Sequence, residues 1–140
     1  MDHKDFIVDT RGGDRHVYIQ VKCGTRLRQN QLWCVARYLP NQIPTSARVF
    51  YLFAFLDLRS IELTSMWLVP ARDFNRLAYR RKHGTRVELW FKTPAEDRRW
   101  DRFTVDRKEL GDRVAALIGA TPAEKKIIAP ARSLALRLVA

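Results

Sequence analysis

The clearest hydrophobic pattern in the chain is a strict alternation over residues 16–23. Apolar β-branched residues at positions 17, 19 and 21 alternate with Tyr18, Gln20 and Lys22. Successive side chains of a β-strand point to opposite faces, so this stretch predicts a strand with one packed face and one polar face. The polar face carries an amide oxygen and an ammonium group two residues apart.

Four other stretches predict strands. A short run at residues 6–9 precedes the turn residues Gly12-Gly13, so it should form a hairpin with the alternating strand. Residues 47–58 are rich in Val, Phe, Tyr and Leu and predict a strand that is buried on both faces. Residues 65–69 predict a strand that stops at Pro70, and residues 86–91 alternate as a half-exposed strand does.

Helical spacing predicts three helices, over residues 29–38, 73–82 and 106–118. Asp73 is the expected N-cap of the second helix, and Gly84 its expected stop. The third has a capping-box variant in Asp106 and Glu109, and Gly119 should end it.

These elements predict an α/β fold in which a small mixed sheet of four or five strands is flanked by helices. We expect one domain over residues 1–120, followed by a C-terminal helical segment over residues 121–140. Ile127, Ile128, Leu134 and Leu138 lie in this segment, and they favour a homo-oligomer contact. The alternative is that the segment packs on its own sheet.

The chain is strongly basic, with 26 Lys and Arg against 15 Asp and Glu in 140 residues and a net charge of +11. A charge of this size favours a nucleic acid as partner, and the alternative is a protein that simply has a basic surface. Cys23 and Cys34 fit no metal or disulfide pattern, so we expect reduced, partly buried thiols in a cytoplasmic protein. The longest apolar stretch is too short to cross a membrane.

A candidate site lies on the predicted hairpin. The carboxylate of Asp5, the amide oxygen of Gln20 and the ammonium of Lys22 have the chemistry to hold a divalent cation and a phosphate. Asp9 is the substitute if Asp5 is misplaced. The remaining candidates are better explained as surface, turn, helix-end or packing residues: His3, His16, His83, Asp57, Glu62, Arg80-Arg81-Lys82, Trp90 and Trp100.

The pattern Asp5-Phe6-Ile7-Val8, a turn, then Ile19-Gln20-Val21-Lys22 resembles the core of the restriction-endonuclease-like nucleases, the PD-(D/E)XK superfamily, in its variant with Gln-x-Lys. Met66-Trp67-Leu68-Val69-Pro70 with Asp73-Phe74 extends the resemblance to bacterial domains of unknown function, so that it spans residues 5–81. The resemblance implies that Asp5 and Gln20 coordinate Mg²⁺ with help from the Val21 carbonyl. Lys22 would orient the attacking water or offset charge on the phosphate.

The resemblance therefore implies a magnesium-dependent endonuclease that acts on DNA phosphodiesters. The chain departs from the family pattern in two respects: Gln20 lacks the negative charge of the usual Glu, and almost nothing precedes Asp5 where the family has a helix. A segment upstream or a partner subunit would have to supply that helix. These departures favour an alternative, an inactive DNA-binding or assembly module of the same fold. A third possibility is a basic protein that binds another protein.

Overall fold

We analysed a computed structural model of the chain, which describes residues 4–9, 15–25, 32–93, 98–119 and 137–139. Its elements are, in chain order, β1 (Lys4–Asp9), β2 (His16–Thr25), β3 (Trp33–Tyr38), η2 (Pro40–Gln42), β4 (Val49–Asp57), β5 (Glu62–Pro70), α1 (Ala71–Leu77), β6 (Tyr79–His83), β7 (Arg86–Lys92), η3 (Asp101–Phe103), β8 (Thr104–Val105), α2 (Leu110–Leu117) and β9 (Arg137–Val139).

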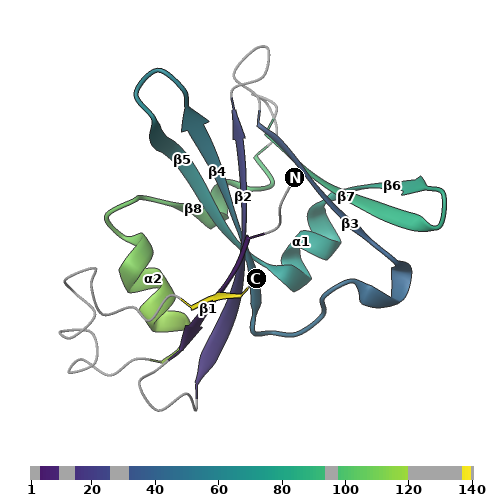
Figure 1. Cartoon of the computed structure of the whole chain (residues 1–140), viewed down its shortest axis with the longest axis horizontal. Helices are drawn as coiled ribbons and strands as arrows, with labels where there is room; N and C mark the ends of the chain where they lie inside the picture. Colours follow the sequence, from purple (N-terminus) through teal and green to yellow (C-terminus); the bar gives the residue numbers. More distant parts are fainter. Residues whose placement is uncertain (1–3, 10–14, 26–31, 94–97, 120–136, 140) are drawn as a thin grey trace.

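The strands form two sheets, which we call sheet A and sheet B (Figure 1). Sheet A has six strands in the order β8-β5-β4-β2-β1-β9, and sheet B has three in the order β3-β7-β6. In sheet A, β2 is antiparallel to β1 and parallel to β4, and β4 is antiparallel to β5. The expected mixed α/β class is confirmed, although strands outweigh helices more than the sequence suggested.

Each face of sheet A covers its own hydrophobic core. One core lies between sheet A, α1 and sheet B, and its large members include Tyr51, Phe53, Phe74 and Phe91. The other lies between sheet A and α2, and it contains Val17, Ile19, Phe50, Leu52, Val114 and Ile118. Figure 1 shows α2 on one side of sheet A, with α1 and sheet B on the other. The molecule is therefore layered, and sheet A forms its middle.

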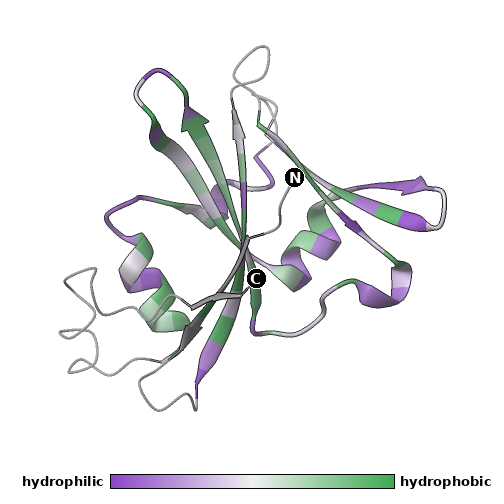
Figure 2. Ribbon diagram, viewed as in Figure 1, coloured by the Kyte–Doolittle hydropathy of each residue, from purple (hydrophilic) through white to green (hydrophobic). Residues whose placement is uncertain are grey.

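Strand β4 is at the centre of both cores, as its unbroken apolar run predicts. Residues 51 and 53 face α1 and sheet B, whereas residues 50, 52 and 54 face α2. Figure 2 shows hydrophobic residues along β4 and hydrophilic ones along β6. The expected strands at residues 6–9, 16–23, 47–58, 65–69 and 86–91 are all confirmed.

The helix expected over residues 29–38 is wrong in its described part, because Trp33–Tyr38 is strand β3. The apolar run is short enough to fit either the spacing of a helix or the alternation of a strand. The structure has the alternation of a strand. Cys34 and Ala36 are buried in the core while Trp33 is exposed. Antiparallel pairing with β7 selects the strand, since tertiary partners override weak local propensity.

The helix expected over residues 73–82 is only partly correct. Helix α1 begins at Ala71 with Pro70 as N-cap, so Asp73 lies in its first turn and is not the cap. The helix ends at Leu77, and Tyr79–His83 form strand β6. Gly84 has φ +61° and lies in the turn between β6 and β7, where it serves a hairpin and does not end a helix.

The third helix is shorter than expected. Helix α2 spans Leu110–Leu117, and its N-cap Glu109 makes no capping side-chain hydrogen bond. Asp106 accepts a hydrogen bond from the backbone N–H of Lys108 at 3.3 Å, so it closes a turn before the helix, and the expected capping box is wrong. Gly119, with φ +63°, ends the helix as predicted.

The expected helical segment over residues 121–140 lies mostly outside the described residues. Arg137–Val139 are described, and they form strand β9, which pairs antiparallel with β1. This part of the tail is therefore a strand that packs on its own sheet. The oligomer contact stays a prediction. Within the described ranges, no helix is long and apolar enough to cross a membrane.

Candidate functional site

The β1–β2 hairpin aligns two of the three predicted site residues. Its antiparallel register places Asp5 directly opposite Gln20, and Lys4 opposite Val21. Residues that face each other across a ladder are close neighbours on one face of the sheet. Asp9 pairs with His16 at the other end of the hairpin, so this register does not bring position 9 beside Gln20. Asp5 is therefore the better placed of the two candidate acids.

Gln20 and Lys22 lie on the face of sheet A that is turned toward α1 and sheet B. Their partners in the parallel strand β4 are Tyr51 and Phe53, which are both fully buried in the core on that side. The Lys22 side chain is buried as well, with an exposed fraction of 5%. An ammonium group at this depth is costly unless polar groups contact it, so its burial implies polar partners within the apolar layer.

Two tyrosines form hydrogen bonds at Gln20 on the same face of sheet A. The Tyr38 hydroxyl donates to Gln20 Oε1 at 2.9 Å, and the hydroxyl oxygens of Tyr38 and Tyr51 lie 2.5 Å apart. Because Tyr38 gives its proton to the amide, Tyr51 donates the hydrogen bond that joins the two hydroxyls. The Gln20 amide is therefore held by Tyr38 of sheet B, whose hydroxyl in turn accepts from Tyr51 of sheet A. The sequence did not point to these tyrosines, since Tyr38 was expected at the end of a helix.

The donors along this strand suit a hard cation. Gln20 offers an amide oxygen, the Val21 backbone offers a carbonyl, and position 5 is a carboxylate residue in register with them. Magnesium takes oxygen ligands and keeps several waters, so few protein donors are needed. Among the described residues, no group of three or more His, Cys, Asp or Glu side chains converges on one point. The donors named here are oxygen atoms, the type that Mg²⁺ takes, whereas zinc sites are built mainly from Cys and His.

The other sequence candidates do not join this site. His16 packs edge-on against the Tyr18 ring, and Asp57 accepts a backbone hydrogen bond from Arg59 at 2.9 Å, as a turn residue does. The basic run at residues 80–82 lies on strand β6, so its expected place at a helix end is wrong. Trp100, from the predicted basic loop, is a core residue with 1% exposure, in line with the packing role that the sequence favoured for it. His3 lies outside the described residues.

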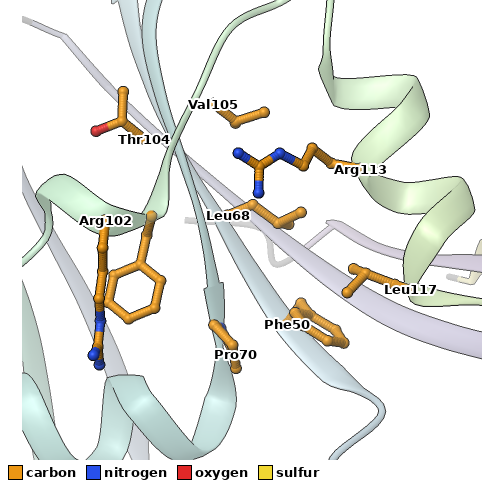
Figure 3. A pocket seen from close by; sticks show the side chains of 9 residues that line it. Phe50, Leu68, Pro70, Arg102, Thr104, Val105, Arg113 and Leu117 are labelled. Carbon is orange, nitrogen blue, oxygen red and sulfur yellow. The ribbon is translucent and has the colours of Figure 1, made fainter.

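A separate hollow lies on the opposite face of sheet A (Figure 3). Its volume is about 190 Å³, and apolar side chains such as Phe50, Leu68 and Val105 form much of its wall. Figure 3 shows Arg113 extending from α2 toward Leu68, with Arg102 on the far side. Phe50 belongs to the core under α2, so sheet A separates this hollow from Gln20 and Lys22. It plays no part in the candidate site.

Cys34 lies close to the site, since its Sγ is 3.9 Å from the Lys22 carbonyl oxygen. Burial raises the pKa of the Cys34 thiol to about 12, although the nearby Lys22 charge acts in the opposite direction. Burial also raises the pKa of Cys23, but that residue is exposed. Both cysteines are free thiols, as expected. Cys34 is buried, whereas Cys23 is exposed, so the expected burial is wrong for Cys23.

We expect the two thiols to react very differently. The thiolate is the reactive form, and at pH 8 almost none of Cys34 is ionised, whereas Cys23 is accessible. Titration of the native protein with a disulfide reagent at pH 8 should show one thiol, and denaturant should release the second. Rapid reaction of two native thiols would contradict this placement of Cys34. A Cys23→Ser variant, which should show no fast thiol, is the control.

We compared the chain with protein-family models, with curated proteins and with solved structures, and none of the three comparisons returned a significant match. An inference about function therefore rests on the hairpin register and its hydrogen bonds.

Proposed function

We propose that this chain is a magnesium-dependent nuclease domain with a restriction-endonuclease-like core, acting on DNA phosphodiesters. The observation that carries the proposal is the register of the hairpin. It sets Asp5 opposite Gln20, and Lys22 follows two residues later on the same strand face. The position of sheet A between α2 on one side and α1 on the other is consistent with the expected core.

Each residue has a distinct task in this proposal. Asp5, Gln20 and the Val21 carbonyl would hold Mg²⁺, and Tyr38 orients the Gln20 oxygen by its hydrogen bond. When bound, the cation would acidify a water and offset negative charge on the phosphate. Lys22 would add a positive charge next to that phosphate from a buried position, where electrostatic interactions are screened less than at the surface.

The charge of the chain supports DNA as the substrate. A net charge of +11 favours a polyanion, and arginine predominates over lysine among the 26 cationic residues. Such binding comes largely from released counterions, so it should weaken steeply as salt is added.

One observation favours an alternative, a DNA-binding or assembly module that has lost cleavage. The Gln20 oxygen, which the cation would need, already accepts a hydrogen bond from Tyr38. An amide oxygen has two lone pairs, so it can accept this bond and still ligate a metal, but it carries no charge to attract one. The structure is thus compatible with a fold that is kept while the cation site is weak or absent.

The charge at position 20 decides between these functions. We expect Gln20→Glu to lower the magnesium concentration needed for half-maximal cleavage by about tenfold, because a second carboxylate attracts the cation. The measurement is cleavage of supercoiled and linear DNA over a magnesium titration. Gln42→Glu in η2 makes the same charge change on an exposed residue and should leave the curve unmoved. If the wild type and Gln20→Glu both fail to cleave at any magnesium concentration, the nuclease function is wrong, and DNA binding that weakens steeply with salt then supports the inactive module.

A further inference from the structure

Sheet B turns one face to the core and the other away from it. Residues 34, 36, 87, 89 and 91 are buried in the core, so the alternate positions of the same strands lie on the opposite face. We call this the outer face of sheet B. Its residues are Trp33, Val35 and Arg37 from β3, Arg86, Glu88, Trp90 and Lys92 from β7, and Tyr79, Arg81 and His83 from β6.

Three aromatic rings gather at one end of the outer face. Lys92 Nζ lies 5.0 Å from the ring centre of Trp33, 5.2 Å from that of Tyr79 and 5.4 Å from that of Trp90. The guanidinium of Arg99 lies 4.1 Å from the ring centre of Tyr79. Trp33 is 46% exposed, which is unusual for the largest apolar side chain. The end of the sheet is therefore an accessible platform of rings interleaved with cations.

Glu88 holds this platform in place. Its side chain is buried, and it accepts hydrogen bonds from Arg37 Nε at 2.9 Å and from the indole N–H of Trp90 at 3.0 Å. The hydrogen bond from Arg37 is the main cause that lowers the pKa of Glu88, so the carboxylate stays ionised. One buried acid thus fixes both a tryptophan and an arginine on the outer face.

The charge of sheet B is strongly asymmetric. Strand β3 has one Lys or Arg, β6 has three and β7 has two, while Glu88 is the single acidic residue in these three strands. The residues of β6 at positions 80–83 are all exposed, and so is Arg86 after the turn. Figure 2 shows hydrophilic residues along β6, toward the free end of its hairpin with β7. Arg37, Arg81 and Arg86 lie on the outer face and form a basic strip that continues from the platform of rings. Arg80 and Lys82 occupy the alternate positions of β6, on the opposite face.

We propose that the outer face of sheet B binds single-stranded nucleic acid. Unpaired bases expose flat faces that stack on aromatic rings, whereas the bases of a duplex are already stacked on each other. The cations of β6 and β7 would follow the phosphates, and Trp33 would take a base. Exposed arginines dominate the basic strip, and a surface of one charge sign favours a polyanion over a protein partner of mixed charge. The inference goes beyond the proposed function, since this surface needs neither metal nor cleavage.

The test is binding of labelled oligonucleotides of about 12 nucleotides in EDTA, a length within the usual site size of such surfaces. Fluorescence anisotropy should show tighter binding of oligothymidine and oligouridine than of a duplex of equal length. Comparison of oligouridine with oligodeoxyuridine, which differ only in the 2′-hydroxyl, shows whether the sugar is recognised. Trp33→Ala should weaken binding about tenfold, in line with the loss of one stacked base. Arg81→Gln should lower the slope of log affinity against log salt by about 0.7.

Two matched variants make the result decisive. Arg107→Gln removes the same charge from an exposed position before α2 and should change neither affinity nor slope. Tyr18→Ala truncates an aromatic residue that is 42% exposed on β2, near Gln20, and should leave single-strand binding unchanged. Binding that prefers the duplex, or that falls more with Tyr18→Ala than with Trp33→Ala, would overturn the proposal. Circular dichroism of each variant confirms that the fold is kept. A protein that binds in EDTA but never cleaves would refute only the nuclease function.

Discussion

Lys22→Ala is expected to abolish magnesium-dependent cleavage while leaving DNA binding nearly intact. Lys22 is one of 26 cationic residues, so its loss barely changes the broad electrostatic attraction to DNA. The charge that develops on a phosphate in the transition state has far fewer partners. Removal of one such partner costs roughly a hundredfold to a thousandfold in rate. Cleavage and binding should therefore separate in this variant.

The assay follows supercoiled and linear DNA with and without magnesium, with wild type and variant purified in parallel. Lys108→Ala, in an exposed turn before α2, is the matched control and should cleave as the wild type does. Because Lys22 is buried, Lys22→Met is a second variant that keeps most of the side-chain volume. Asp5→Ala should remove cleavage and magnesium binding together. Equal cleavage by wild type and Lys22→Ala would point to a contaminant or another active site, and our assignment of β2 would be wrong.

The largest effect on stability is expected for Trp100→Ala. Trp100 is 1% exposed and packs against Phe91, with ring centres 4.7 Å apart, and against Phe74 at 6.0 Å. Its indole N–H donates to the Lys92 carbonyl oxygen at 2.9 Å. Removal of a large buried ring leaves a cavity and an unpaired carbonyl, so the free energy of unfolding should fall by about 3–5 kcal/mol. A domain of this size can lose most of its stability in this way.

Urea unfolding followed by circular dichroism measures this loss without relying on tryptophan fluorescence. Trp33→Ala is the matched control, because the same truncation at an exposed position should cost less than about 1 kcal/mol. Trp100→Phe keeps an aromatic ring and loses the hydrogen bond, so an intermediate cost is expected. Equal midpoints for Trp100→Ala and Trp33→Ala would mean that the segment around residue 100 does not close the core between the sheets.

The sequence predicted part of the candidate site. Alternation over residues 16–23 placed Gln20 and Lys22 on one strand face, since the period of a strand is intrinsic to its backbone. A Gly-Gly turn then made a hairpin with Asp5 the simplest arrangement, and the observed register agrees. The sequence could not predict the contact of Tyr38 with Gln20 and Tyr51. Their contact joins two different sheets, and local sequence does not specify how sheets pack.

By itself, the sequence determined β2 and β7, whose alternation fits only the period of a strand, and it favoured a strand for the apolar run of β4. It also determined the end of α2, because only glycine readily takes the positive φ found at Gly119. Tertiary structure decided β3 and β6, whose short runs fit a helix or a strand equally well. Both strands pair with β7, and the gain from that pairing outweighs their weak local preference. The outer face of sheet B exists only through this choice, because as helices these segments would not align Trp33, Trp90 and Tyr79 on one surface.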